Sequence, residues 1–391
     1  MLLDTSSGSV LFWLLPVLAG CAGGLALTPL TRLVALRTGT IDRPIGQKIH
    51  KYATPLLGGV AVYVAFALVA IVFLPLTGPV VGVLAGGLAA IVVGVLDERL
   101  DLPPLIHLGG QTLAALIAIV SGVGVLRTIS IPTATLSTPG FSLPLGIGLV
   151  VTLIWLVGMM NTVNFLDGMD GLAAGIATIA AVLLAVWASE KHLVGLVDST
   201  HHQDLILPAI LAGALVGFLP YNWHRARIFL GDSGSMFLGM ALGTISIIGP
   251  TKLGTALLVL LIPVVDVAWA IVRRRVQGRS SVLGDKKHFY HRMLNLGMSH
   301  TTVVLLLYVL VGGIALLDLE LRKLDKLIAF VLLASAVGLA FILLETRSLH
   351  REEAERLQTA GANSNSLGGA TTRSGEPADG QEDHDRVDVS R

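Results

Sequence analysis

The sequence predicts an all-α, polytopic membrane protein: a bundle of about eleven transmembrane helices, with the N-terminus outside and the C-terminus in the cytoplasm. Apolar residues make up 53% of the 391 residues and charged residues only 14%, and the mean hydropathy is +0.79. A soluble domain carries about 25% charged residues. The charge is missing mainly from runs of about 20 residues, the length that crosses a bilayer as a helix. The single cysteine, Cys21, excludes an intrachain disulfide.

Eleven apolar runs define the predicted helices. Their apolarity is continuous and does not alternate, which favours helices over the strands of a membrane barrel. The first nine residues lack the basic segment of a secretory signal, so we expect the first run to be retained as a span. The predicted spans are residues 10–36, 56–76, 79–96, 105–123, 143–163, 170–188, 205–221, 233–250, 253–272, 301–318 and 326–345.

The distribution of basic residues predicts the orientation. With the N-terminus outside, the inner loops hold more than twice as many lysines and arginines as the outer loops, as the positive-inside rule requires. Residues 351–391 are rich in Ser, Gly, Thr, Asp and Glu and poor in large apolar side chains, which predicts a disordered cytoplasmic tail. Residues 1–350 form the predicted membrane domain. The segments with candidate chemistry follow spans 1, 3, 5, 7 and 9, so we expect one site on the cytoplasmic face.

The loop after the third span contains Asp97 and Glu98. Two adjacent carboxylates at a membrane boundary are costly unless a cation joins them. They indicate either a phosphate and metal site or an interfacial polar turn that meets water.

The loop after the fifth span carries polar residues at every third position, followed by two Asp-Gly turns: Asn161, Asn164, Asp167 and Asp170. Asp170 alone is explained as a helix N-cap. The two asparagines on the last turns of an apolar helix are not, and they favour a hydrogen-bonded ligand such as a nucleotide or sugar.

The loop after the seventh span begins with Asn222 and ends with Gly231-Asp-Ser-Gly-Ser. A turn of this kind at the start of a helix presents backbone N–H groups beside a carboxylate, which suits phosphate together with Mg²⁺. Asp232 is therefore the predicted metal ligand, or else only a helix cap. Nearby Arg225 and Arg227 favour an anionic ligand.

The loops after the ninth and first spans add positive charge to the same face. The ninth is followed by Arg273 to Arg275 and then His288 and His291. The arginines act as topology anchors or lipid contacts, and Arg274 is a candidate substrate ligand. The two histidines suit a zinc pair or phosphate, and phosphate is preferred because no further zinc ligand follows. The first is followed by Lys48 and Lys51.

Taken in this order, the segments resemble the polyprenyl-phosphate N-acetylhexosamine-1-phosphate transferases of the glycosyltransferase 4 family. The similarity runs from about Arg43 to Leu296. Its most specific parts are Asn164-Phe-Leu-Asp167-Gly-Met-Asp170-Gly-Leu and Gly231-Asp-Ser-Gly-Ser. The segment Asp285-Lys-Lys-His-Phe-Tyr-His-Arg, like the eleven spans, is similar to the N-acetylglucosamine branch, whereas the muramoyl-pentapeptide branch typically has three successive histidines.

The resemblance implies roles for individual residues. Asp97 would contact or deprotonate the lipid phosphate, and Asp232 would bind Mg²⁺, with Mn²⁺ as an alternative. His288 and His291 match the first and last histidines of the family's His-x-His-His motif. The expected catalytic residues are Asp97, Glu98, Asp232 and His288. The expected substrate-binding residues are Lys48, Lys51, Asn161, Asn164, Asp167, Asp170, Asn222, Arg274 and His291.

Three positions depart from the family pattern. Glu98 stands where an aspartate is usual, His107 where a lysine is common, and Tyr290 at the middle histidine. None of them removes Asp97, Asp232 or His288, so we expect an active enzyme.

The sequence therefore predicts a phosphoglycosyl transferase of the bacterial cytoplasmic membrane. It would move N-acetylhexosamine-1-phosphate, in the first place the N-acetylglucosamine compound, from a UDP-sugar to undecaprenyl or decaprenyl phosphate. This would release UMP and start a cell-envelope glycan. A homodimer is left open, and no nucleic-acid partner is expected. The alternatives are a phospho-N-acetylmuramoyl-pentapeptide transferase and, outside the enzymes, a polytopic anion transporter.

Overall fold

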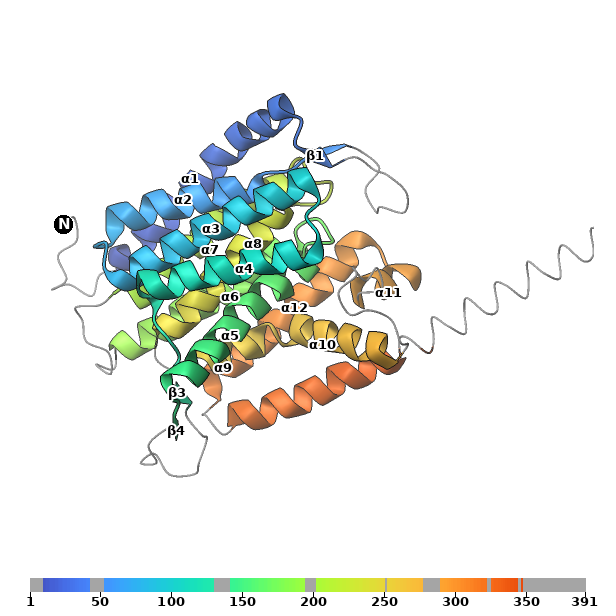
Figure 1. The fold of residues 1–391 in the computed structure, drawn as a ribbon. Coiled ribbons are helices and arrows are strands. Elements are labelled where there is room, and N and C mark those ends of the chain that lie inside the picture. The colour runs from blue at the N-terminus through green and yellow to red at the C-terminus, as the bar shows by residue number, and fades with distance from the viewer. Residues whose placement is uncertain are drawn as a thin grey trace, which may run out of the picture. The chain divides into compact units, whose positions relative to one another are not determined.

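The computed structural model describes residues 10–42, 53–129, 141–193, 202–249, 252–276, 289–321, 325–343 and 346. Its helices are α1 (Val10–Thr38), α2 (Gly58–Phe73), α3 (Gly78–Leu100), α4 (Pro104–Ala118, continued by a π turn over Ile119–Val123), α5 (Leu145–Leu166), α6 (Leu172–Leu193), α7 (Gln203–Asn222), α8 (Gly231–Ile248), α9 (Lys252–Val259), α10 (Leu261–Val276), α11 (Phe289–Asn295) and α12 (His300–Glu320). A further helix covers Asp325–Leu343. Figure 1 shows these helices as a bundle.

The described strands are two short antiparallel pairs between helices. Strands β1 (Ile41–Asp42) and β2 (Thr54–Pro55) connect α1 to α2. Strands β3 (Thr128–Ile129) and β4 (Phe141–Ser142) connect α4 to α5. The all-α fold class is therefore confirmed.

The predicted spans can be compared with the helices one by one. Among the described residues, eight helices are long and apolar enough to cross a membrane, and α9 with α10 forms a ninth candidate bent by 71°. The two remaining predicted spans, 56–76 and 233–250, correspond to α2, a shorter apolar helix, and α8, whose first turn is polar. Every predicted span thus contains a helix, and the protein is a multi-pass membrane protein.

The outer surface of the bundle is apolar, as a lipid environment requires. Large apolar side chains stand exposed on several helices, for example Leu105 on α4, Ile154 on α5 and Val309 on α12. Apolar surface of this extent indicates contact with another apolar phase. The predicted tail, residues 351–391, lies outside the described part of the chain.

Glycines bring helix backbones into direct contact, which is the usual way helices associate in lipid. A Cβ added at Gly24 of α1 would lie 2.3 Å from the carbonyl oxygen of Ala214 in α7. A Cβ added at Gly94 of α3 would lie 2.3 Å from the Cα of Ser233 in α8. The contact between α3 and α8 matters most for function, because it brings the end of α3 against the first turn of α8.

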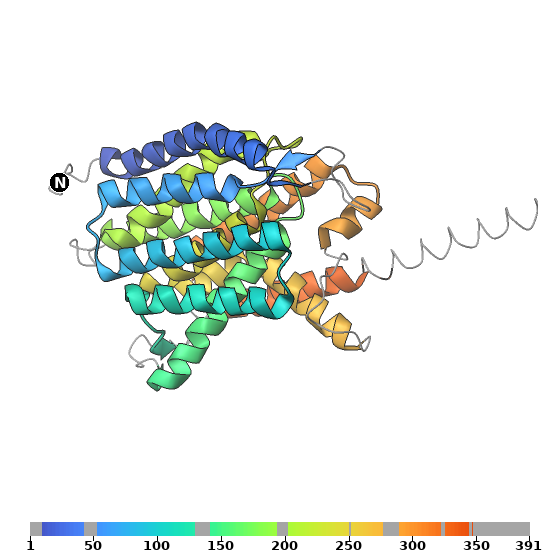
Figure 2. The ribbon, with the colours of Figure 1, turned by 45° about the horizontal axis from the view of Figure 1, so that its top comes forward.

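The polar loops gather at one end of the bundle. The segment before α8 is joined to the first residues of α2 by two backbone hydrogen bonds, Gly58 N to Phe229 O (3.0 Å) and Gly59 N to Leu230 O (2.9 Å). In Figures 1 and 2 the strand pair β1–β2, the end of α3 and α11 lie at this same end. The expectation of one shared face for the loops after spans 1, 3, 5 and 7 is consistent with these contacts.

Candidate active site

The first turn of α8 meets the last turns of α5. The Asn164 amide nitrogen donates to Asp232 Oδ1 (2.7 Å) and to Ser235 Oγ (3.0 Å). The N-cap position of α8 is Leu230, and no side chain caps the helix there. Asp232 therefore points at α5 and does not cap its own helix, so the capping alternative does not explain its side chain.

Glu98, at the end of α3, binds the same turn of α8. Its Oε1 accepts hydrogen bonds from the backbone N–H (3.0 Å) and the hydroxyl (2.9 Å) of Ser233. Its Oε2 is buried and has no hydrogen-bond partner among the described residues. Gly231 allows this approach: it has φ +77°, and a Cβ there would lie 2.4 Å from Glu98 Oε1.

Asp167, directly after α5, adds a third carboxylate. Burial raises its pKa well above the usual range, and the charges of Asp232 and Glu98 raise it further. The backbone N–H of Gly231 opposes this shift only in part. Three carboxylates that repel one another are the ligands that a hard divalent cation prefers. Asp232, Glu98 and Asp167 are therefore candidate ligands for a hard divalent cation, and the Glu98 oxygen that has no described hydrogen-bond partner is a further candidate donor atom.

Asp97 lies beside this cluster but has different partners. Its Oδ1 accepts from the backbone N–H of Leu102 (3.0 Å), and its Oδ2 lies 2.8 Å from Nδ1 of His107. His107 continues to Gln111 of α4, which in turn accepts from Asn161 of α5 (2.7 Å). Asn161, predicted to bind substrate, is thus connected to Asp97 through two side chains that were not among the predicted site residues.

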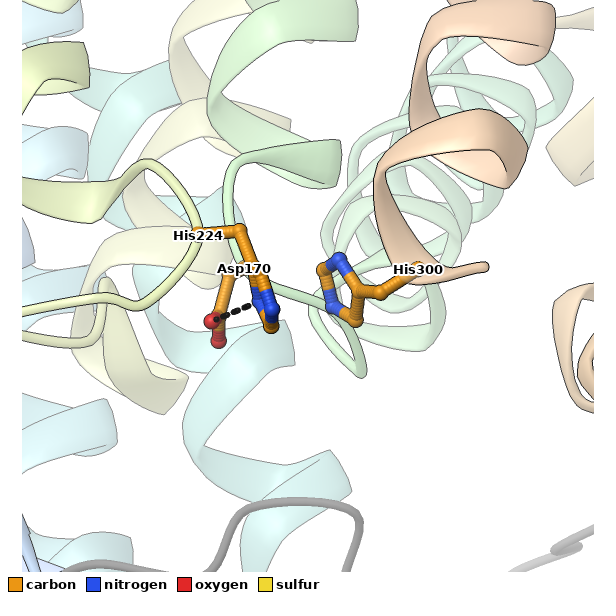
Figure 3. A group of neighbouring side chains, drawn as sticks. All are labelled: Asp170, His224 and His300. Carbon is orange, nitrogen blue, oxygen red and sulfur yellow. Dashed lines mark hydrogen bonds and ion pairs between the residues drawn. The ribbon is translucent and has the colours of Figure 1, made fainter. Parts of the chain in front are cut away.

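Asp170 lies in a separate group with His224 and His300 (Figure 3). Its Oδ2 accepts from the backbone N–H of Ala226 (3.1 Å) and lies 3.1 Å from His224 Nδ1. The rings of His224 and His300 are stacked, with centroids 4.4 Å apart and planes inclined by 20°. Neither histidine was predicted as a site residue.

The ligand atoms of this group lie within 4.8 Å of one another, a spacing at which one carboxylate and two imidazoles could bind one metal ion. The lone pairs of an imidazole lie in the plane of its ring, however, so those of two stacked rings run side by side and do not converge. In this arrangement the group orders the loop after α7 through Asp170.

Asn222 ties two loops together. Its Oδ1 accepts from Gly171 N (3.1 Å), its Nδ2 donates to Ile228 O (3.0 Å), and its side chain is buried. The hydroxyl of Tyr308 donates to the carbonyl of Gly171. Backbone groups bond both the oxygen and the nitrogen of the Asn222 amide, and this geometry supports a role in holding the Asp167–Gly171 turn.

The structure places His291 in α11, partly buried, with its ring centroid 4.5 Å from that of Tyr290. Tyr290 itself is buried and packs against Gly168, where an added Cβ would collide with its hydroxyl. Burial, with the charges of Asp266 and Asp167, raises the pKa of Tyr290. The tyrosine therefore acts as a neutral packing partner of the Asp167 turn.

Four predicted residues have no described side chain. Lys48, Lys51 and His288 lie outside the described residues, and Arg274 lies in α10 with its side chain not described. Their roles stay predictions.

The structure thus has a carboxylate cluster at one end of a bundle of apolar helices, and the comparisons with known proteins show which class of enzyme carries it. The chain belongs to glycosyl transferase family 4, whose family model matches residues 80–250. That range includes Asp97, Glu98, Asn164, Asp167 and Asp232.

Individual relatives narrow the class. The chain is 36% identical over 318 residues to a decaprenyl-phosphate N-acetylglucosaminephosphotransferase of Mycolicibacterium smegmatis, covering 73% of this chain and 76% of the relative. The enzyme of the same name from Mycobacterium tuberculosis is 34% identical, with coverage of 73% and 76%. An undecaprenyl-phosphate alpha-N-acetylglucosaminyl 1-phosphate transferase of Thermotoga maritima is 27% identical, with coverage of 68% and 76%.

Proposed function

We propose that this protein transfers N-acetylglucosamine-1-phosphate from UDP-N-acetylglucosamine to a polyprenyl phosphate and releases UMP. The observation that carries the proposal is the cluster of Asp167, Glu98 and Asp232, which sits at the end of the bundle where the polar loops meet and leaves a buried oxygen of Glu98 without a partner. The names of the relatives supply the substrate class.

In the proposed reaction an oxygen of the lipid phosphate forms a bond to the β-phosphorus of the UDP-sugar. The bond from that phosphorus to the bridging oxygen breaks, and UMP leaves with the electron pair. A phosphate monoester loses its second proton near pH 6, so the nucleophile is largely ionised at neutral pH. The protein mainly has to position the two substrates and balance their charge.

Asp232, with Glu98 and Asp167, would hold Mg²⁺, which when bound neutralises charge on a pyrophosphate. Asn164 donates to Asp232, and we assign contact with the lipid phosphate to Asp97, whose charge acts on Asp232. We assign nucleotide-sugar binding to the inner loops, with Asn164, Asp167, Asp170, Arg274 and His291 as ligands. Lys48, Lys51 and His288 complete the proposed set.

The proposed topology has eleven spans, an outer N-terminus and an active site on the cytoplasmic side of a bacterial inner membrane. It counts α2, α8 and the bent pair α9–α10 as spans. The basic residues of the inner loops support it. A cytoplasmic site also gives access to a soluble nucleotide-sugar, which does not cross the bilayer.

A transporter of anionic solutes is the rival from another class. Transporters place their polar groups near the middle of the bilayer. In this chain Asp97, Glu98, Asp167 and Asp232 lie at helix ends, which favours chemistry at the membrane surface.

The test uses detergent-purified protein with polyprenyl phosphate, magnesium and a panel of UDP-sugars. We expect UMP release, without any membrane gradient, with UDP-N-acetylglucosamine and not with UDP-muramoyl-pentapeptide. Absence of UMP release with every UDP-sugar, from protein that remains folded, would contradict the proposal.

A further inference from the structure

Four polar side chains form a continuous hydrogen-bonded chain across α5, α4 and α3. Asn161 Nδ2 donates to Gln111 Oε1 (2.7 Å), Gln111 Nε2 lies 2.9 Å from His107 Nε2, and His107 Nδ1 lies 2.8 Å from Asp97 Oδ2. Gln111 is fully buried, and the side chains of His107 and Asp97 are each 17% exposed. A buried polar chain inside apolar helices is costly unless every member has a partner.

The chemistry of the groups fixes the direction of every bond. The same side-chain atom of Asn161 that faces Gln111 also lies 2.8 Å from the backbone carbonyl oxygen of Val157, which can only accept, so this atom is the amide nitrogen. The group of Gln111 that faces it is therefore the carbonyl oxygen. The nitrogen of Gln111 then faces His107 and can also only donate. Nε2 of His107 must therefore accept, and the proton of the neutral ring sits on Nδ1, from which it is donated to Asp97.

The same arrangement ties both carboxylate sites to one helix. Asn161 and Asn164 are three residues apart on α5 and share one of its faces. Asn164 bonds Asp232 directly, and Asn161 holds Asp97 through Gln111 and His107. Helix α5 thereby sets the position of one carboxylate relative to the other.

We propose that His107 is a positioning residue, held by Gln111 as the Nδ1–H tautomer so that Asp97 keeps one orientation beside the magnesium cluster. With Leu102 N on one oxygen and His107 Nδ1 on the other, both oxygens of Asp97 are anchored. This rests on the proposed function, since the group that Asp97 meets is the lipid phosphate. The orientation of Asp97 is therefore set by the order of donors and acceptors along Asn161, Gln111, His107 and Asp97.

Two substitutions at position 107 separate positioning from packing. In His107→Asn the amide nitrogen can stand near the place of Nδ1 and donate to Asp97, whereas His107→Leu removes the donor at similar size. We expect His107→Leu to lower kcat on the order of 10²-fold, the cost of a misplacement of about 1 Å. The KM for UDP-N-acetylglucosamine should change little, and His107→Asn should recover most of kcat.

Thr112→Ala is the matched control, because Thr112 lies on the same helix, is only partly buried, and its side-chain hydroxyl donates to the carbonyl of Leu108 in its own helix. It should behave as the wild type. Equal losses in His107→Asn and His107→Leu, or full activity in His107→Leu, would overturn the proposal.

A spectroscopic readout needs no activity. Histidine side chains labelled with ¹⁵N, with the His107 signals assigned as those missing from His107→Asn, should have a protonated Nδ1 and a bare Nε2. In Gln111→Glu the new carboxylate cannot donate, so Nε2 should become protonated. A wild-type ring protonated at Nε2, or signals unchanged by Gln111→Glu, would refute the tautomer assignment whether or not the enzyme transfers sugar phosphate. Failure of the wild type to release UMP would instead refute the proposed function.

Discussion

Replacing Asp232 by Asn removes one charge from the carboxylate cluster at nearly constant size, which makes the structural and the chemical roles separable. The hydrogen bond from Asn164 Nδ2, 2.7 Å in the wild type, can still be accepted by the amide oxygen. A carboxylate in the first turn of a helix contributes about 0.3–1 kcal/mol through the helix dipole. Set against about 5–15 kcal/mol of total stability, this loss leaves nearly all of the protein folded. A purely structural Asp232 therefore predicts an activity within about twofold of the wild type.

A metal-binding Asp232 predicts a much larger loss. Weakening a bound divalent cation removes several kcal/mol of charge stabilisation, and about 3–4 kcal/mol corresponds to roughly 10²–10³ in rate. The assay is initial-rate UMP release at saturating UDP-N-acetylglucosamine over a wide range of magnesium concentrations. The matched control is Asp101→Asn, which removes a charge from an exposed residue at the end of α3 whose φ of +49° asparagine tolerates.

We expect Asp101→Asn to be near normal and Asp232→Asn to fail at every magnesium concentration. Near-normal turnover and magnesium dependence in Asp232→Asn would refute the assignment and leave Asp97 with Glu98 as the candidate metal site.

Four further predictions rest on the helix packing, the predicted topology, the proposed site and the predicted tail. Gly94→Ala should push α3 away from α8, destabilise the fold by about 1–3 kcal/mol through overpacking, and so lower both the melting temperature and the activity. Gly109→Ala, with open space around it, should change neither, and equal melting temperatures of the two variants would contradict the close packing. In a variant without Cys21, cysteines at positions 136 and 200 should be labelled from outside intact cells and those at 48 and 283 should not; outside labelling at 283 would overturn the topology. Asp170→Asn should raise the apparent KM before it abolishes turnover, and an effect on kcat alone would count against a ligand-binding role. Truncation after His350 should leave specific activity within a few-fold, and a hundredfold loss in folded protein would assign the tail a role.

The helices were predictable because a span needs a run of apolar residues of fixed length, and each of the eleven predicted runs contains a helix. The 71° bend between α9 and α10 was not predicted, since residues 253–272 are apolar apart from Thr255 and Asp266 and such a run does not show where a helix changes direction. Pro263 is the available signal: it stands in the first turn of α10, where its missing N–H is tolerated.

The carboxylate cluster was also predictable in outline. Asp97, Glu98, Asp167 and Asp232 end or begin apolar helices, and alternation of the eleven predicted spans would bring them to one face. Which element each of these carboxylates bonds to was not predictable. The bond of Glu98 to the first turn of α8 depends on the close contact of α3 with α8, which the sequence does not encode locally. The bond between Asp97 and His107 depends on the packing of α3 against α4.

The residues that sequence reasoning missed share a physical cause. Gln111 lies in the middle of the predicted span 105–123, where a polar side chain in lipid is itself a signal of a functional or structural partner. His224 and His300 are far apart in sequence and join only through the packing of the loop after α7 against the start of α12. The family resemblance implied that Asn222 binds substrate, but only the structure shows that backbone groups bond both the oxygen and the nitrogen of its amide.

The fate of the β-phosphorus tests the central claim most directly. UDP-N-acetylglucosamine with ³³P at the β-phosphate is incubated with the purified protein, polyprenyl phosphate and magnesium, and the lipid and aqueous products are separated. Transfer of sugar-1-phosphate predicts that the label enters the lipid fraction, bound to N-acetylglucosamine, while unlabelled UMP appears in equal amount. Label retained in water-soluble UDP, with sugar alone on the lipid, would contradict the account.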